Sequence, residues 1–505
     1  MSSLPLGFDI DYRLLLAARA ILPGAALVLL LWDLTRRSGR TRAWRLALAT
    51  VGTLSFLAWW NFGALHGRGR PIHVHDVFHY YLGSKYYAEL NYTHIYRCAA
   101  VWEVQRGGAV DVARRWSRDL VTNELEARVP TSAETEECLT RFGETRWREF
   151  SADLDWFRAR LGRRWDPVFR DRGFNATPVW TTIGYWLSGF GAASDAQILS
   201  LALLDVAAIL IMWIAVWRTF GWEVACVALT WWGVSGGYGY LGGAFLRNDA
   251  YVLATLSICA MKVGRPVLAG GALAAATVLR IFPVVLLAGL GVKVLFTAHR
   301  DGAGTAWRRY RRFAAGFLLC AISLLAFSAM TWASSWHGIL EPWQSFADNT
   351  RRHMGSLTAN QLGLHGLLAF DPTGTMSNVT VRQATYWVIV PAFGTLFALR
   401  ARFLHDWELL VFSVAFIPVA ATMANYYYTI LLVFTFLWPL DRLVGIGLVA
   451  VAFSIGMMPA VTDSRADAYL FASVGLVLFS VFVLWRAGSF AIRPPETARG
   501  ERLQI

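Results

Sequence analysis

The sequence His-Val-His-Asp-Val-Phe-His-Tyr-Tyr-Leu-Gly-Ser-Lys-Tyr-Tyr occupies residues 73–87, and the interpretation of the whole chain starts from it. It follows an apolar run that ends near Leu65, and it opens the longest polar stretch of the chain. In a helix, Asp76, His79 and Tyr80 would share one face, because residues three and four apart are neighbours. A charged group where a membrane span meets water is costly unless it has a function or a partner. A belt of aromatic residues and histidines at a helix end is the alternative interpretation.

The composition is typical of a membrane protein. Of the 505 residues, 56% are hydrophobic and only 16% are charged, whereas a soluble domain carries about 25% charged residues. Several runs approach the roughly 20 apolar residues that cross a bilayer, so we expect an all-α polytopic membrane protein with about 11–13 transmembrane helices. The net charge of +13 then indicates topology rather than a nucleic-acid partner.

Two clusters of arginines indicate which ends of the spans face the cytoplasm, where loops are enriched in Lys and Arg. The first cluster lies at the end of residues 1–45, an N-terminal region that contains one span and one basic loop. The next span then carries the chain to the extracytoplasmic side. The second cluster predicts a cytoplasmic loop that contains Arg300, Arg308, Arg309, Arg311 and Arg312. The C-terminal spans then occupy residues 441–486, and a cytoplasmic tail occupies residues 487–505.

Two large extracytoplasmic loops follow from this topology, at residues 66–176 and 334–382. The first contains amphipathic pieces such as Trp147 to Leu161, which predict helices lying along the membrane surface. It also contains Cys98 and Cys138, which can oxidise outside the cytoplasm. Closing a loop of about 40 residues stabilises a protein by a few kcal/mol, so we predict a disulfide; two unrelated thiols are the alternative.

Five polar islands lie at helix ends predicted on the extracytoplasmic side. They are Asp76 with its neighbours, Arg247-Asn248-Asp249, Arg280, Asn360-Gln361, and Asn425 with Tyr426, Tyr427 and Tyr428. A local salt bridge or a helix cap explains any one of them, but their common side suggests a shared cavity. The sequence has no Walker loop, no Gly-rich dinucleotide turn and no Cys-rich zinc spacing. It therefore indicates neither a soluble nucleotide-activated donor nor a cofactor.

Three motifs occur in order along the chain: Asp76 with a tyrosine pair four residues on, Arg265-Pro266-Val267-Leu268-Ala269-Gly270-Gly271-Ala272-Leu273 leading to Arg280-Ile281-Phe282-Pro283, and Asn360-Gln361-Leu362 before Gly366-Leu367-Leu368. Their order resembles the GT-C superfamily of membrane glycosyltransferases, and within it glycosyltransferase family 87, the polyprenyl-phosphate-mannose-dependent mannosyltransferases. The family usually has Lys where this chain has Arg280, and often has Ser where it has Leu362.

The resemblance implies a GT-C-type catalytic region over residues 46–440, with Asp76 as the catalytic base. It implies inverting transfer of a mannose-like sugar from a polyprenyl-phosphate donor to an extracytoplasmic glycolipid, glycan or protein acceptor, without a cofactor. We expect the protein in the bacterial cytoplasmic (inner) membrane, with its active site facing outward. Such transfer needs a carboxylate to take the acceptor's proton and a cation to neutralise the leaving phosphate.

The remaining candidate site residues take roles around that reaction. Arg280 and Arg247 are the candidate ligands of the donor phosphate, although an arginine at this depth can also snorkel to the interface. The candidate substrate-binding residues are His79, Tyr80, Tyr81, Lys85, Asp249, Asn360, Gln361 and Tyr427. Two other interpretations remain open. One is a transporter or flippase of a lipid-linked saccharide, and the other is a divalent metal site in which His73 and His75 join His79 and Asp76.

Overall fold

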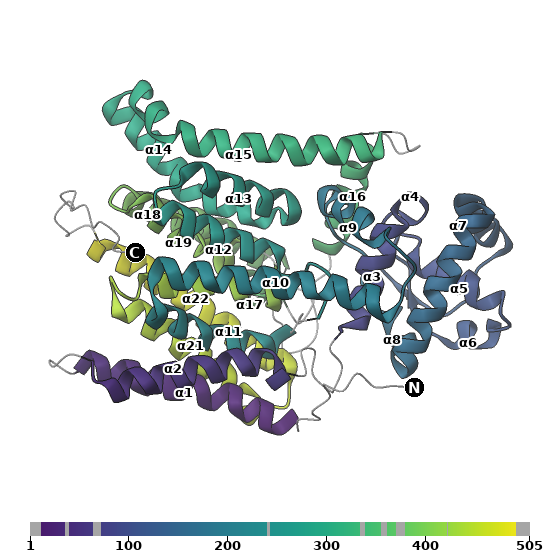
Figure 1. The fold of residues 1–505 in the computed structure, drawn as a ribbon, viewed down its shortest axis with the longest axis horizontal. Coiled ribbons are helices and arrows are strands. Elements are labelled where there is room, and N and C mark those ends of the chain that lie inside the picture. The colour runs from purple at the N-terminus through teal and green to yellow at the C-terminus, as the bar shows by residue number, and fades with distance from the viewer. Residues whose placement is uncertain are drawn as a thin grey trace.

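The computed structural model describes residues 12–35, 40–63, 72–239, 243–333, 339–354, 361–369, 379–421 and 423–490. These residues form α-helices almost throughout, with two short antiparallel two-stranded sheets. Figure 1 shows a bundle of long helices and, at its right-hand end, a group of shorter helices. In the described part of the chain, seven helices are long and apolar enough to cross a membrane. The expectation of an all-α polytopic membrane protein is therefore confirmed.

The bundle collects the helices that the apolar runs predict. It contains α1 (Tyr12–Thr35), α2 (Arg42–Trp59), α10 (Asp195–Phe220), α11 (Trp222–Gly239), α12 (Asp249–Lys262), α13 (Pro266–Arg280), α14 (Leu287–Asp301), α15 (Ala303–Trp332), α18 (Val379–Ala401), α19 (Asp406–Ser413), α20 (Phe416–Ala420), α21 (Arg442–Val461) and α22 (Arg465–Phe490). Three 3₁₀ segments complete it: η1 (Asn61–Gly63), η3 (Phe282–Leu286) and η4 (Asn425–Leu437). Several of these helices are shorter than a full span, so the expected 11–13 crossings stay a prediction.

Small residues allow two of these helices to pack closely. A Cβ atom on Gly270 of α13 would lie 2.1 Å from the carbonyl oxygen of Phe313 on α15, and one on Gly316 would lie 2.1 Å from that of Val267. Membrane helices associate through such close packing, because lipid supplies no hydrophobic force between them. Elsewhere on α15, Leu319 and Ile322 are exposed, as expected for side chains that face lipid.

The basic stretch at residues 308–312 lies on a helix and not in a loop, which corrects the expected loop. Helix α15 begins at Ala303, so the arginines from 308 to 312 belong to its first turns. Arginine is a good helix former, and its apolar stem can pack while its charge stays in water. Arg309 donates to Asp406 at the start of α19. In Figure 1, α14 and the adjoining start of α15 lie at the end of the bundle opposite the short helices.

The short helices form a domain with a core of its own, which we call the loop domain (residues 72–177). It contains α3 (Val74–Lys85), α4 (Tyr87–Leu90), α5 (Ile95–Val104), α6 (Ala109–Arg114), β1 (Ser117–Arg118), β2 (Leu125–Glu126), α7 (Ser132–Leu161), η2 (Gly162–Arg164) and α8 (Trp165–Val168). Cys98 and Cys138 form a disulfide that joins α5 to α7. In α7, Phe150 and Phe157 are fully buried in this core. The amphipathic pattern therefore marks packing inside a domain and not a helix on the membrane surface.

Two helices connect the loop domain to the bundle, and the first strand of a small sheet follows them in the second predicted loop. Helix α9 (Pro178–Ser188) begins at Thr177, whose hydroxyl donates to the carbonyl oxygen of Val278 in α13 at 2.8 Å. Helix α16 (Glu341–Met354), from the second predicted loop, covers the loop domain, and Asn349 donates to the carbonyl oxygen of Phe174 at 3.2 Å. The strand β3 (Gln361–Leu362), followed by α17 (Leu364–Ala369), pairs with β4 (Met423–Ala424). Both predicted loops therefore meet one end of the bundle.

Candidate functional site

The first turn of α3 is anchored to the segment that precedes α12. The backbone N–H of His73 donates to the carbonyl oxygen of Gly243 at 2.9 Å. The Nδ1 atom of His73 accepts a hydrogen bond from the backbone N–H of Asp76 at 3.1 Å, as a helix N-cap does. These two bonds hold Asp76 beside residues 243–248, which lie more than 160 positions later in the chain.

Asp76 forms an ion pair with Arg247. The Nε atom of Arg247 lies 3.2 Å from Oδ1 of Asp76, and the two side chains are 5% and 12% exposed. Among the described residues, no donor bonds the buried Oδ2 atom of Asp76. Most buried polar atoms in proteins have a hydrogen-bond partner. The free oxygen of Asp76 can therefore accept a hydrogen bond or a proton from a bound molecule.

Arg280 and Asp249 form a second buried ion pair in the same region. Arg280 donates through Nε to Oδ1 of Asp249 at 3.1 Å and through Nη2 to the carbonyl oxygen of Leu246 at 2.9 Å. Leu246 and Ile281, which flank the pair in sequence, have φ angles of 46° and 59°. Such angles are costly for residues with a side chain and collect at functional sites. The backbone thus bends sharply on both sides of this pair.

The ring of Tyr80 connects the two pairs. The guanidinium carbon of Arg247 lies 3.9 Å from the centre of this ring, and that of Arg280 lies 5.5 Å from it. Both distances allow cation–π attraction. The Tyr80 hydroxyl also contacts Nη1 of Arg247 and donates to Oδ1 of Asn175. Burial raises the pKa of Tyr80 to about 12, so the hydroxyl stays protonated at neutral pH.

The tyrosines at the start of η4 complete this cluster. The hydroxyl of Tyr426 accepts from Nη2 of Arg247 at 3.5 Å, and the rings of Tyr426 and Tyr427 lie 4.4 Å apart. Gln361 pairs with Ala424 in the small sheet that leads into η4. Asn360 lies outside the described residues. Members of four of the five predicted polar islands thus meet at one place, and we call Asp76, Tyr80, Arg247, Asp249, Arg280, Tyr426 and Tyr427 the arginine cluster.

Asp205 supports the arginine cluster and was not among the residues expected from the sequence. Its carboxylate accepts from the backbone N–H groups of Arg247 at 3.1 Å and Asn248 at 3.2 Å, and from the Asn248 side chain at 2.6 Å. It therefore holds the start of α12. It is the only charged residue between Ile198 and Trp217, and a lone acid inside an apolar run is the signal that could have identified it.

Tyr81 and Lys85 lie elsewhere, in the core of the loop domain. The Lys85 ammonium donates to Oδ2 of Asp153 at 2.7 Å, to the carbonyl oxygen of Gly191 at 2.8 Å and to the Tyr81 hydroxyl at 3.1 Å. Lys85 follows Asp76 by nine positions, which is about 14 Å along a helix at 1.5 Å per residue. These partners give both residues a structural role, so we do not retain the substrate-binding role expected for them.

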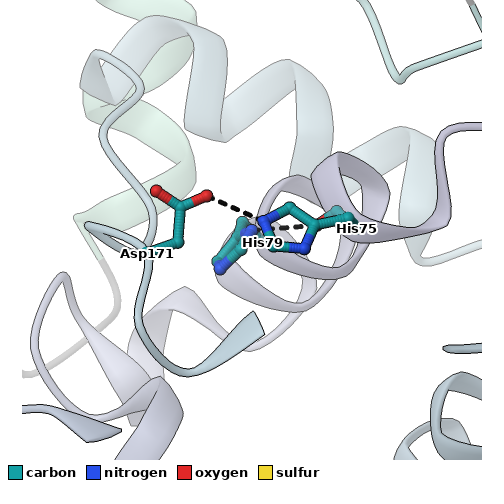
Figure 2. A group of neighbouring side chains, drawn as sticks. All are labelled: His75, His79 and Asp171. Atoms are coloured by element: carbon teal, nitrogen blue, oxygen red, sulfur yellow. Dashed lines mark hydrogen bonds and ion pairs between the residues drawn. The ribbon is translucent and has the colours of Figure 1, made fainter. Parts of the chain in front are cut away.

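The histidines of α3 meet a different acid from the one expected. Nε2 of His75 lies 2.9 Å from Oδ2 of Asp171, which follows α8 (Figure 2). His79 donates through Nδ1 to the carbonyl oxygen of His75 at 2.9 Å, and its Nε2 lies 2.6 Å from the Tyr96 hydroxyl. Burial lowers the pKa of His79 to about 4, so this ring is neutral at pH 7.

This arrangement changes the metal-ligand set that the sequence suggests. Asp76 turns to Arg247, and Nδ1 of His73 caps the helix, so the two do not join His75 and His79. Burial also lowers the pKa of His73 to about 4. Within the described residues, the group that could hold a metal ion consists of His75, His79 and Asp171. Asp171 lies 96 positions after His75, and no local pattern in the sequence indicates it.

The chemistry of the arginine cluster follows from its parts: a carboxylate with an available oxygen, two buried guanidinium groups, and aromatic faces. These groups lie where an apolar bundle meets a polar domain, so the cluster can bind an anionic headgroup and accept a proton. No protein-family model, curated protein or solved structure matches this chain.

Proposed function

We propose that the protein is an inverting glycosyltransferase of the GT-C superfamily, similar to family 87. It moves a mannose-like sugar from a polyprenyl-phosphate donor to an acceptor on the extracytoplasmic side of the bacterial cytoplasmic membrane. The observation that carries the proposal is the free oxygen of Asp76 beside two buried arginines, Arg247 and Arg280, where the bundle meets the loop domain. A lipid-linked donor presents its polyprenyl chain, its phosphate and its sugar in the same order along the membrane normal.

In this reaction Asp76 is the general base. Its Oδ2 accepts the proton of an acceptor hydroxyl while that oxygen forms a bond to the anomeric carbon of the sugar. The bond from the anomeric carbon to the phosphate oxygen breaks, and the polyprenyl phosphate leaves with the bonding electrons. Attack opposite to the leaving phosphate inverts the anomeric centre. Arg247 orients the Asp76 carboxylate through their ion pair, which leaves Oδ2 available to the acceptor.

Arg280 is the candidate ligand of the donor phosphate. Its bonds to Asp249 and Leu246 use Nε and Nη2, and a guanidinium group carries five N–H donors in total. The remaining donors can bind phosphate oxygens, and arginine–phosphate hydrogen bonds are among the stronger ones in proteins. Asp249 holds the side chain in place before the donor arrives. A fixed cation at the leaving group stabilises the charge that develops there.

Aromatic side chains are available for the sugar. Tyr427 packs against both Tyr426 and Phe282, with ring centres 4.4 Å and 5.1 Å apart, respectively. The flat face of an aromatic ring is apolar while its edge or hydroxyl can hydrogen bond, which suits a sugar ring. The arginine cluster lies between the bundle on one side and the loop domain with α16 on the other. An acceptor glycolipid, glycan or protein would therefore meet the loop domain and α16 first.

The test is a transfer assay with membranes that contain the protein. Radiolabelled polyprenyl-phosphate sugars are added, and the products are separated and identified, with their anomeric configuration determined by NMR. The proposal expects label in a new glycoside of inverted configuration, and none with membranes that lack the protein. Donor that crosses the bilayer without a new glycosidic bond would instead support a flippase. Retention of configuration would contradict the role of Asp76 as base in a single displacement.

A further inference from the structure

We propose that His75, His79 and Asp171 bind a divalent transition-metal ion, of which Zn²⁺ is the best candidate. The three residues come from the first half of α3 and from the segment after α8, and Figure 2 shows them facing one another. This site is separate from the arginine cluster. Its existence does not depend on the proposed transferase activity, because metal binding is measured without any donor.

The geometry brings three ligand atoms together. One nitrogen from each histidine and one oxygen of Asp171 all lie within 4.8 Å of one another. The two histidines are four positions apart on a helix, so their rings extend from the same face. Bonds from zinc to nitrogen or oxygen are about 2.0–2.2 Å long. Small rotations of the three side chains therefore suffice to close them on one ion.

The hydrogen bonds of His79 prepare it as a ligand. Its Nδ1 carries the proton, because it donates to the carbonyl oxygen of His75. That bond leaves the lone pair on Nε2, the atom that faces the Tyr96 hydroxyl. Metal-bound histidines commonly donate their other ring N–H to a backbone carbonyl, which fixes the ring and the tautomer. In the ion-free structure, the Tyr96 hydroxyl donates to this lone pair and would yield its place to the ion.

The set of ligands selects the class of ion. Imidazole nitrogen suits zinc, copper, iron and nickel, whereas magnesium and calcium prefer oxygen ligands throughout. Two histidines and one carboxylate leave a position for water or another ligand, as in three-ligand zinc sites. The carboxylate of Asp171 is half exposed, with 49% of its side chain accessible, so an ion can reach the site from solvent.

An ion here would reinforce the position of the arginine cluster. His75 and His79 flank Asp76 in the sequence of α3, and Asp171 precedes Asn175, which accepts a hydrogen bond from Tyr80. The metal would therefore join the helical turn that carries the carboxylate to the segment that orients the tyrosine. We infer a positioning role for the ion and no direct part in the transfer.

The experiment uses the purified full-length protein in detergent, stripped with a chelator and then titrated with Zn²⁺. Calorimetry gives the affinity, and elemental analysis gives the number of ions bound. We expect one ion per chain and a higher Tm with zinc. Asp171→Asn and His75→Gln should each weaken binding by more than the roughly 10- to 100-fold that loss of an outer-shell partner costs. A millimolar excess of Mg²⁺ should leave zinc binding unchanged.

The matched control is His94→Gln. His94 pairs with Glu137 at 3.0 Å in the same domain, but no second histidine belongs to that pair. The control should bind zinc as the wild type does. Because His79 is buried and its replacement can unfold the domain, the exposed Asp171 decides the test. Wild-type protein that binds no zinc, Asp171→Asn that binds as tightly as wild type, or an equal loss in the control would each overturn the proposal.

Discussion

Helix α3 carries a buried ion pair near each end, and the two pairs differ in how completely they are satisfied. At the C-terminal end, Lys85 donates to three acceptors, and Asp153 is fully buried. Oδ2 of Asp153 accepts from Lys85 and from the Tyr86 hydroxyl, and Oδ1 accepts from the backbone N–H of Ala193. All three N–H donors of Lys85 are thus used, and both oxygens of Asp153 have partners.

At the N-terminal end, Asp76 and Arg247 are paired, but Oδ2 of Asp76 has no donor among the described residues. Each pair joins a carboxylate to a cation, and both pairs are taken out of water. A pair whose oxygens all have hydrogen-bond partners fixes the structure around it. A pair with one oxygen left over can still bond to another molecule. Buried polar networks are costly when a hydrogen bond is missing. This difference makes the N-terminal end of α3 the candidate functional end.

The largest expected effect follows from replacing Asp76. Asp76→Asn keeps the size of the side chain and removes the proton acceptor, so the rate of sugar transfer should fall by about 10²- to 10⁴-fold. The Tm should fall less than it does when Lys85 is replaced, because the amide oxygen can still accept from Arg247, which also keeps its contacts with Tyr80 and Tyr426. The initial rate of label transfer and thermal unfolding in detergent measure the two effects. Asp155→Asn, an exposed carboxylate of the loop domain, is the control and should retain the rate. A wild-type rate in Asp76→Asn would contradict the distinction between the two ends.

Replacing Lys85 should instead lower the stability of the protein and leave donor binding unchanged. Lys85→Met leaves the charge of Asp153 buried without its cation, and breaking a buried pair in this way costs about 3–5 kcal/mol of stability. We expect a large fall in Tm in detergent, while donor binding per folded molecule stays at the wild-type level. The double variant Lys85→Met/Asp153→Asn should recover part of the loss, since neither charge is then buried alone. If the single variant unfolds at the wild-type temperature, Lys85 does not stabilise the domain.

A smaller effect is expected for the phosphate ligand. Arg280→Lys keeps a positive charge beside Asp249 but loses the planar fork, so folding should survive. A hydrogen bond to a charged group contributes about 1.5–3 kcal/mol, so donor binding should weaken by roughly 10- to 100-fold. Equilibrium binding of the labelled donor measures this loss. Arg309→Lys, at the opposite end of the bundle, is the control. Donor affinity that is equal in Arg280→Lys and wild type would contradict the phosphate role.

Sequence periodicity predicts which residues of α3 share a face. In a helix, Asp76 and Tyr80 are four apart, and in the structure both contact Arg247. The apolar runs likewise predict spans such as α10 and α21 to within a few residues, because length and hydropathy determine a membrane helix. The break between α19 and α20 carries no such signal, because its residues are as apolar as those around it.

The partners in space could not be predicted from local patterns. Asp153 lies 68 positions from Lys85, and the spacing of charges along the chain does not indicate which of them meet. Similarly, the amphipathic pattern of residues 147–161 is the same whether the apolar face meets a membrane or a domain core. The core of the loop domain, with Phe150 and Phe157 inside it, decides between the two.

The smallest expected effect concerns an ion pair at the surface. Glu134 accepts two hydrogen bonds from Arg128, at 2.6 Å and 2.8 Å, and its carboxylate also caps α7 at Thr131. The hydrogen bonds from Arg128 lower the pKa of Glu134 from 4.5 to about 2 in the folded protein. A carboxyl whose pKa is lower in the folded state stabilises that state above pH 4.5, and this contribution disappears as the pH falls through 2.

Glu134→Gln should therefore lower the Tm slightly at neutral pH, within the roughly 1 kcal/mol that a solvent-screened pair contributes. The difference in Tm between wild type and variant should shrink as the pH is lowered from 4.5 toward 2. Arg128→Gln removes the same pair from its other side and should also lower the Tm at neutral pH, with a difference from wild type that shrinks over the same pH range. A difference that stays constant over this range would show that the charge of Glu134 contributes nothing. Glu134 would then stabilise the protein only through hydrogen bonds that a neutral side chain also makes, in contrast to the charged groups in the buried pairs of α3.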